Sequence, residues 1–187
     1  YSNNIEQLDD SIENGLPIDI ITTKGRYMGT GFLSKNSHIT VRILIKDRTQ
    51  VIDKAFFKRR IQFAYDYRKT LERNNLTNCR LIFGEADQLP GLTVDRYNDI
   101  LVTQISSYGL DNINDTIYEI LLEVIKEDNQ DVKAIYERND INIRSKEGLP
   151  LEKGYWRNAN LPTTTIINEN GLKLNVDVEN GQKTGYF

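Results

Sequence analysis

The sequence predicts an α+β protein with a small N-terminal β pseudo-barrel, a helical connector and a second unit that mixes strands and helices. Three observations lead to this prediction. Short strand-like segments separated by Gly and Asn turns occupy residues 18–45. Apolar residues recur at helical spacing over residues 53–74, and strand-like and helix-like segments alternate from residue 79 onward.

The composition is that of an ordinary globular protein. The chain has 187 residues, of which 39% are hydrophobic and 27% charged, and no apolar run approaches the roughly 18–20 residues of a membrane span. One cysteine, Cys79, and one histidine, His38, exclude a disulfide framework and a His/Cys metal site with three or four ligands. We therefore expect a reduced, cytoplasmic protein with no metal and no membrane contact.

The N-terminal segment predicts three short strands, at residues 18–23, 27–34 and 39–45. Gly29-Thr30-Gly31 lacks a third glycine and a following helix, so it indicates a bent barrel strand and not a dinucleotide-binding loop. About forty residues make a thin core for a barrel, and the chain begins with Tyr1. We therefore expect the pseudo-barrel to be incomplete, with further strands before Tyr1.

Residues 53–74 predict the helical connector. Asp53 is a suitable N-cap, and Phe57, Ile61, Ala64 and Leu71 fall on one helical face. The basic residues Lys58, Arg59, Arg60, Arg68 and Lys69 fall mostly off that face.

The second half predicts one α+β unit with strands on both sides of a helix. Strands are expected at residues 79–83, 92–97, 100–106, 132–137, 166–169 and 172–178, and an amphipathic helix at residues 113–125. Pro90-Gly91, Asn98-Asp99 and Asn170-Gly171 supply the turns, and the last pair is the strongest hairpin signal in the chain.

Charge is unevenly distributed along the chain. The net charge is −3, yet residues 24–73 contain 13 Lys/Arg against 4 Asp/Glu, a net of +9. A basic surface attracts phosphates, and aromatic side chains are interleaved with it at Phe56, Phe57, Phe63, Tyr65 and Tyr67. Packing in the core is the competing explanation for most of these rings. Six basic residues are predicted to contact RNA because of their charge and their position in the sequence: Arg26, Lys35, Arg42, Lys58, Arg59 and Arg60.

Three other motifs have simpler structural explanations. In Gly181-Gln182-Lys183-Thr184-Gly185 the residue directly before the lysine is Gln182 and not a glycine, so the segment is not a P-loop. Glu85 and Asp87 could form a catalytic carboxylate pair, but capping of a turn by Asp87 explains them more simply. Residues 137–140 read as a salt-bridged turn after a strand.

Several segments resemble one known family in order. GRYMGTGFLSKNSHITVRIL (25–44) is similar to the latter part of a PUA domain, an RNA-binding pseudo-barrel. RLIFGEADQLPGLTVDRYNDILVTQ (80–104) and ENGLKLNVDVENGQKTGYF (169–187) resemble the RlmI-type large-subunit ribosomal RNA methyltransferases. These enzymes methylate carbon 5 of cytosine with S-adenosylmethionine, and the resemblance covers essentially the whole chain.

The resemblance implies a fragment of such an enzyme that lacks its Rossmann-like domain and is inactive alone. It divides the chain into a partial PUA-like domain (1–47), a basic helical connector (48–75), a central α+β domain (76–178) and the start of the missing domain (179–187). It places Gln182, Lys183, Thr184 and Tyr186 near the S-adenosylmethionine cofactor. The cysteine that attacks carbon 6 of cytosine would lie beyond Phe187, because Cys79 is outside any matching motif, so no catalytic residue is assigned here.

The expected partner is ribosomal RNA, and a homodimer is left open. One alternative is a non-catalytic RNA-binding adaptor built from the same modules. The other is a small hydrolase that uses Glu85 and Asp87.

Overall fold

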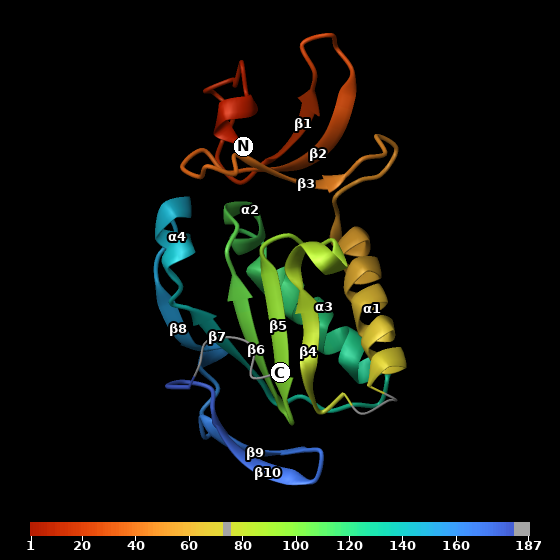
Figure 1. The fold of residues 1–187 in the computed structure, drawn as a ribbon, viewed down its shortest axis with the longest axis vertical. Helices are drawn as coiled ribbons and strands as arrows, with labels where there is room; N and C mark the ends of the chain where they lie inside the picture. Colours follow the sequence, from red (N-terminus) through yellow and green to blue (C-terminus); the bar gives the residue numbers. More distant parts are fainter. Residues whose placement is uncertain (73–75, 182–187) are drawn as a thin grey trace.

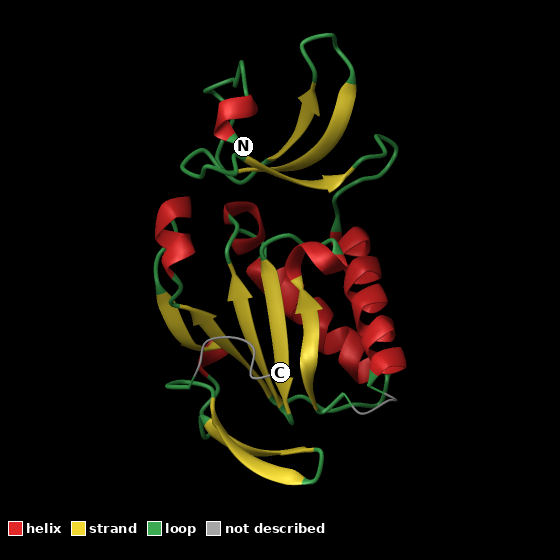
Figure 2. Cartoon of the chain, in the orientation of Figure 1, coloured by secondary structure: helices red, strands yellow, loops and turns green. Residues whose placement is uncertain are grey.

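The computed structural model describes residues 1–72 and 76–181, which form three sheets and the helices that accompany them (Figures 1 and 2). A three-stranded sheet lies at one end of the molecule and a five-stranded sheet lies in the middle, with helices beside it. A two-stranded hairpin lies at the opposite end. The predicted α+β class is therefore confirmed.

The N-terminal sheet is antiparallel and consists of β1 (Pro17–Ile21), β2 (Tyr27–Leu33) and β3 (Val41–Ile45), preceded by the 3₁₀ turn η1 (Ser2–Asn4). Its middle strand approaches β3 very closely. A Cβ atom on Gly31 would lie 2.0 Å from the carbonyl oxygen of Arg42, and Gly29 has a φ of 156°. The strand pairing is irregular at both of its edges. The two glycines therefore shape a bent strand, as predicted.

Helix α1 (Lys54–Leu71) follows β3 and packs on the five-stranded sheet beside β4 and α3. The Asp53 carboxylate caps it as predicted, accepting a hydrogen bond of 2.8 Å from the Phe56 N–H. The helix buries Phe57, Ile61 and Ala64 as predicted. The expectation for Leu71 is wrong, because this last residue of the helix is exposed.

The five-stranded sheet has the order β4-β5-β6-β7-β8, and its central β6 and β7 are parallel while the other neighbours are antiparallel. Helix α3 (Asn114–Glu127) lies between β6 and β7 in the chain. The strands are β4 (Asn78–Phe83), β5 (Leu92–Tyr97), β6 (Ile100–Ile105), β7 (Ala134–Asn139) and β8 (Glu152–Tyr155). The sequence did not predict β8, a strand of four residues on the sheet edge.

Short helical segments cap the ends of these strands and escaped prediction, because they are too short to show a helical period. They are α2 (Tyr108–Asp111), α4 (Asn142–Glu147), and the 3₁₀ turns η2 (Gly84–Asp87) and η3 (Trp156–Asn158). In residues 1–72 and 76–181, no helix is both long and apolar enough to cross a bilayer.

The last hairpin, β9 (Thr164–Glu169) and β10 (Leu172–Asp177), forms a separate sheet, which corrects the prediction of a single α+β unit. Its turn is the predicted one, with φ of 50° at Asn170 and 85° at Gly171. Ile167 packs on the five-stranded sheet, and the Asn98 amide donates to the Ile166 carbonyl at 2.8 Å. The hairpin therefore docks on the tip of the β5–β6 turn.

The N-terminal sheet is attached to the larger sheet through a polar contact and an apolar contact. The Glu147 carboxylate of α4 is fully buried and accepts hydrogen bonds from Arg42, Ser34 and Ser37. Gly109 of α2 packs directly against the ring of Phe32, where a Cβ would lie 2.2 Å from a ring atom. The two sheets are thus in direct, buried contact.

Candidate nucleic-acid interface

The six predicted RNA contacts divide into two groups in the structure. Arg26, Lys35 and Arg59 are exposed, whereas Arg42, Lys58 and Arg60 bond to other parts of the protein. The division matters because a cation already bonded within the protein neutralises a phosphate less readily than a free one.

Arg42 lies in β3 and is buried. Its guanidinium donates to the Glu147 carboxylate at 2.8 Å, and both side chains are almost completely removed from solvent. A buried ion pair of this kind holds two elements together and is not free to contact an external ligand. Arg42 therefore joins the two sheets and is dropped from the candidate RNA surface.

Lys58 and Arg60 lie in the first turns of α1 and bond to its neighbours. The Lys58 ammonium contacts Glu123 at 2.7 Å and Glu127 at 2.8 Å, and these hydrogen bonds raise its pKa. Arg60 donates to the carbonyls of Gln88 at 2.6 Å and Leu44 at 2.7 Å. These bonds fasten α1 to α3, to the end of η2 and to β3.

The exposed cations lie on the N-terminal sheet and the start of α1. Arg26 sits in the turn between β1 and β2, and Lys35 follows β2, where its ammonium donates to the Asp10 carbonyl at 2.7 Å. Arg59 lies over the ring of Phe56 with 5.9 Å between its Cζ and the ring centroid. Other exposed cations in the same region are Lys24, Lys46, Arg48 and Lys54, which the prediction from charge and position had omitted.

A shallow groove of about 440 Å³ lies beside the N-terminal sheet, lined by side chains of β1, of β2 and of the segment after β3. Three of its polar side chains are bonded to one another. Arg48 pairs with Asp19 at 2.9 Å, and Asp19 accepts from Thr30 at 2.5 Å. The Thr30 and Arg48 hydrogen bonds lower the pKa of Asp19. The groove therefore presents an ion pair of mixed sign and not a cationic pocket.

The aromatic residues that are interleaved with the basic residues of α1 are partly buried and partly exposed. Packing explains three of the five, because Phe56, Phe57 and Tyr65 are buried in the main core. Phe63 and Tyr67, further along α1, are more than half exposed. Both outcomes come from one helix. Phe56 and Phe63 are seven residues apart and project in nearly the same direction, so the position along the helix separates the covered ring from the exposed one.

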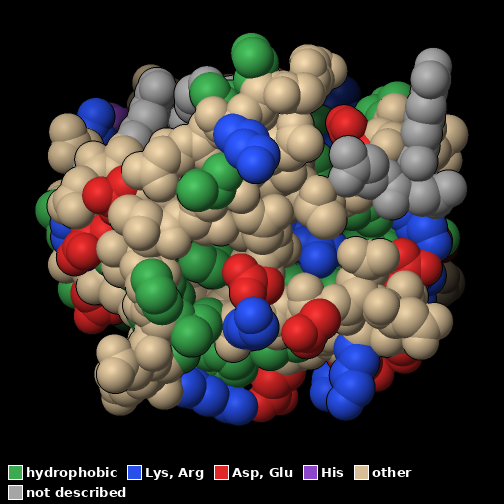
Figure 3. Space-filling model, turned by 90° about the horizontal axis from the view of Figure 1, so that it is seen from below, with side chains coloured by type: hydrophobic (Ala, Val, Ile, Leu, Met, Phe, Trp, Pro, Cys, Tyr) green, Lys and Arg blue, Asp and Glu red, His purple; other side chains and the backbone are tan. Residues whose placement is uncertain are grey.

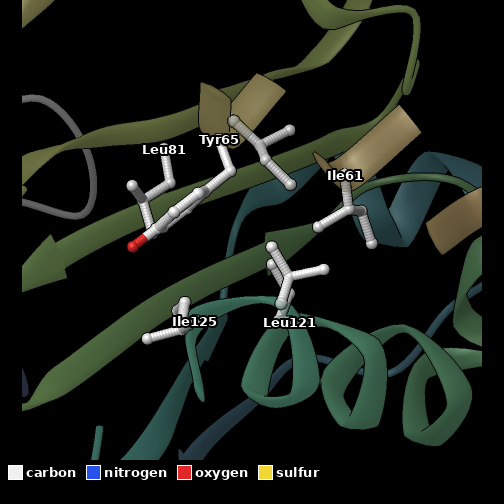
Figure 4. Close-up of a pocket in the computed structure, with 7 residues that line it drawn as sticks. Ile61, Tyr65, Leu81, Leu121 and Ile125 are labelled. Carbon is white, nitrogen blue, oxygen red and sulfur yellow. The ribbon is translucent and has the colours of Figure 1, made fainter. Parts of the chain in front are cut away.

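A second hollow is a packing defect in the core. It measures about 10 Å³ and lies between α1, α3 and β4 (Figure 4), where its lining is apolar apart from the Tyr65 hydroxyl. Such a volume holds at most one water molecule. The lining residues are Ile61, Tyr65, Leu81, Ile82, Leu121, Val124 and Ile125.

The two carboxylates of the hydrolase alternative have different surroundings. Asp87 pairs with Arg68 at 2.6 Å and accepts from the Phe83 N–H at 2.6 Å, while Glu85 is exposed. Asp87 thus has the capping role that the sequence indicated, and the hydrolase hypothesis is withdrawn.

Residues 137–140 differ from the prediction of a turn. Glu137, Arg138 and Asn139 belong to β7, and only the ion pair of Arg138 with Asp140, at 3.2 Å, matches the expectation. Arg138 also donates to the Val178 carbonyl at 2.8 Å and therefore holds the chain where it leaves β10. Burial raises the pKa of Glu137, which accepts a hydrogen bond from the Tyr118 hydroxyl at 2.9 Å.

Cys79 is buried in the core, where burial raises the pKa of its thiol to about 12. A nucleophilic cysteine needs its thiolate form, which this environment disfavours. The thiol is therefore structural, in agreement with the absence of a catalytic assignment for it.

The reactivity of Cys79 gives a direct test of this environment. At pH 8 a thiol with a pKa of about 12 is ionised in roughly one molecule in ten thousand. We expect a thiol-specific disulfide reagent to label the folded chain negligibly, and to label one thiol per chain once guanidinium unfolds it. Rapid labelling of the folded chain at pH 8 would contradict the buried placement.

The residues assigned to the cofactor, Gln182, Lys183, Thr184 and Tyr186, lie outside the described residues. At the end of the molecule that carries the β9–β10 hairpin, Lys and Arg side chains mix with Asp and Glu (Figure 3).

A family model described as a PUA-like domain matches residues 1–46. Proteins named ribosomal RNA large subunit methyltransferase I are similar over the whole chain. The one from Aliivibrio fischeri (strain MJ11) is 38% identical, that from Shewanella amazonensis 40% and that from Yersinia pseudotuberculosis 37%. In each case the chain covers 46% of the relative, so it spans about half of their length.

Solved structures share the fold. A Streptococcus mutans protein described as a SAM-dependent methyltransferase superimposes with a TM-score of 0.71 at 20% identity, over 94% of this chain and 42% of that protein. A methyltransferase structure in complex with SAH gives a TM-score of 0.73, also at 20% identity, over 92% and 42%. The resemblance seen in the motifs is confirmed: from end to end, these 187 residues are homologous to about half of a large-subunit ribosomal RNA methyltransferase I, with a PUA-like region at the N-terminus.

Proposed function

We propose that this chain is the RNA-binding and substrate-presenting part of an S-adenosylmethionine-dependent ribosomal RNA (cytosine-5) methyltransferase. The observation that supports this proposal most strongly is the 37–40% identity, along the whole chain, to proteins named ribosomal RNA large subunit methyltransferase I. The PUA-like match over residues 1–46 supports contact with RNA.

The proposal assigns RNA binding and cofactor binding to different parts of the chain. The PUA-like domain (1–47), the basic connector (48–75) and the central domain (76–178) would bind and orient the RNA. Residues 179–187 would begin a cofactor-binding domain, with Gln182, Lys183, Thr184 and Tyr186 near S-adenosylmethionine, which supplies the methyl group. The only cysteine of these residues is the buried Cys79, so we expect residues 1–187 alone to be catalytically inactive.

Within this proposal, the phosphate contacts are the exposed Arg26, Lys35 and Arg59. We leave out Arg42, Lys58 and Arg60, because each is buried or only partly exposed and its charged group bonds to another element of the fold. Phosphate contacts supply a salt-dependent affinity that depends little on sequence.

Salt titration tests the three contacts together. Replacing Arg26, Lys35 and Arg59 with glutamine is expected to flatten the dependence of log K on log salt by about 2–3, since each phosphate contact contributes about 0.7–0.9. Filter binding of a ribosomal RNA fragment at several salt concentrations measures this slope. A matched variant, with glutamine at the exposed Lys126, Lys153 and Lys173, is expected to keep the original slope. An unchanged slope in the first variant would remove the proposed contacts.

Methyl transfer separates the enzyme from the adaptor alternative. The protein expressed from its complete gene is expected to transfer labelled methyl groups from S-adenosylmethionine to carbon 5 of cytosine in ribosomal RNA. Binding of RNA without any methyl transfer would favour a non-catalytic adaptor instead.

A further inference from the structure

Helix α1 exposes aromatic rings on the side that faces away from the core. Phe63 is 66% exposed and Tyr67 is 56% exposed, one helical turn apart on the same face. Phe83, at the end of the neighbouring strand β4, is 55% exposed. Three large rings in solvent on adjacent elements call for an explanation, because large exposed apolar patches mark interaction sites.

Two of these rings are backed by arginines. The Arg68 Cζ lies 5.1 Å from the centroid of the Tyr67 ring, and the Arg80 Cζ lies 5.1 Å from that of Phe83. A guanidinium over one face of a ring leaves the other face available for a planar partner. In each pair, an aromatic or heterocyclic ring could therefore stack on the ring face that the arginine does not cover.

Buried carboxylates hold both arginines in place. Asp87 accepts two hydrogen bonds from Arg68, at 2.6 Å and 3.1 Å, and Asp95 accepts two from Arg80, at 2.7 Å and 3.0 Å. Both carboxylate side chains are less than a tenth exposed. The arginines are thus ordered before any ligand arrives, which lowers the entropic cost of binding.

The same contacts link the Tyr67 pair to the Phe83 pair, and Phe63 lies one helical turn before Tyr67. The Arg68 side chain donates to the Arg80 carbonyl at 2.8 Å, and Asp87 accepts from the N–H of Phe83. Figure 1 shows α1 running beside β4. Arg59, exposed and one helical turn before Phe63, extends the surface toward the N-terminus of the helix.

We propose that Phe63, Tyr67 and Phe83 form a stacking platform for unpaired RNA bases, with Arg59 contacting a phosphate of the same strand. This proposal rests on the proposed function, because it assumes an RNA ligand. Exposed rings interleaved with arginines match the chemistry of single-stranded nucleic acid, whose bases stack on aromatic side chains and whose backbone is anionic.

The test uses the protein expressed from its complete gene and a 12-nucleotide RNA, either single-stranded or paired with its complement. The double variant Phe63→Ala/Tyr67→Ala is expected to bind the single strand roughly tenfold to a thousandfold more weakly, and the duplex within about twofold of the original protein. Its salt slope is expected to stay unchanged, since neither ring neutralises a phosphate. The variant Phe63→Tyr/Tyr67→Phe keeps both rings and is expected to retain the affinity.

Leu71→Ala is the matched control, because Leu71 is equally exposed one turn further along the helix but has no ring. It is expected to leave RNA binding unchanged. Single-stranded RNA that contains 4-thiouridine is expected to cross-link, on irradiation, to peptides carrying residues 59–67 or Phe83.

The outcomes separate this proposal from the proposed function. If the double variant binds the single strand as tightly as the original protein does, the platform is overturned and the proposed function stands. If the rings instead cover another protein surface, RNA binding is unchanged while the mass of the protein in solution or its melting temperature shifts. If the original protein binds neither RNA, both proposals fall.

Discussion

Replacing Glu147 with alanine is expected to lower the free energy of unfolding by about 3–5 kcal/mol, the usual cost of breaking a buried ion pair. The Glu147 carboxylate is fully buried between α4 and the N-terminal sheet, where Arg42 donates to it at 2.8 Å. Ser34 and Ser37 donate to the same carboxylate. Its removal leaves the Arg42 guanidinium buried and without its counter-ion. Urea unfolding followed by circular dichroism measures the loss.

Two further variants show whether the uncompensated charge causes this loss. Glu147→Leu combined with Arg42→Met removes both charges, and it is expected to recover part of the stability. Apolar residues can replace a buried ion pair at little cost, but the buried hydroxyls of Ser34 and Ser37 still lose their acceptor. Glu85→Ala removes an exposed carboxylate and is expected to change the stability by less than about 0.5 kcal/mol. A loss below about 1 kcal/mol in Glu147→Ala would contradict the buried contact between the sheets.

Replacing Phe56 with alanine is expected to cost about 3–5 kcal/mol, because its ring is buried in the main core and the substitution leaves a cavity. The ring meets Phe57 edge to face, with the centroids 5.2 Å apart, and Arg60 covers it at 4.5 Å. All of these contacts disappear with the ring. Thermal or denaturant unfolding gives the difference.

Phe63→Ala is the matched control on the same helix. The same atoms are removed two turns further along, but from a ring that is 66% exposed, so we expect a change of less than about 0.5 kcal/mol. Equal losses in the two variants would contradict the burial of Phe56 and the exposure of Phe63 in this structure. A stable Phe63→Ala protein also allows the RNA-binding experiment on this ring to be interpreted.

The basic segment shows where charge counting gives an incomplete answer. A net charge of +9 over residues 24–73 suggests a cationic surface along the whole segment. In the folded chain, Lys58 pairs with two glutamates of α3, Lys69 with Asp128 and Arg68 with Asp87. These acidic partners are distant in sequence, so only the fold reveals which cations remain free.

Local patterns in the sequence determined the secondary structure where the elements are long or the turns are chemically specific. The N-cap at Asp53, the bend at Gly29 and Gly31 and the Asn170-Gly171 turn are set by backbone sterics and by contacts within a few residues. The motifs also sufficed to identify the relatives. The hairpin of residues 164–177 was predicted as an element, but not its separation from the larger sheet.

Only the tertiary structure decided which side chains are available to a ligand. The sequence gives the same prediction for Arg42 and Arg59. In the structure, Arg42 is buried against Glu147 of α4, whereas Arg59 is exposed. Phe56 and Phe63 differ in the same way. The physical reason is that burial and ion pairing depend on partners brought together by the fold, such as residues 42 and 147, and no local pattern encodes that proximity.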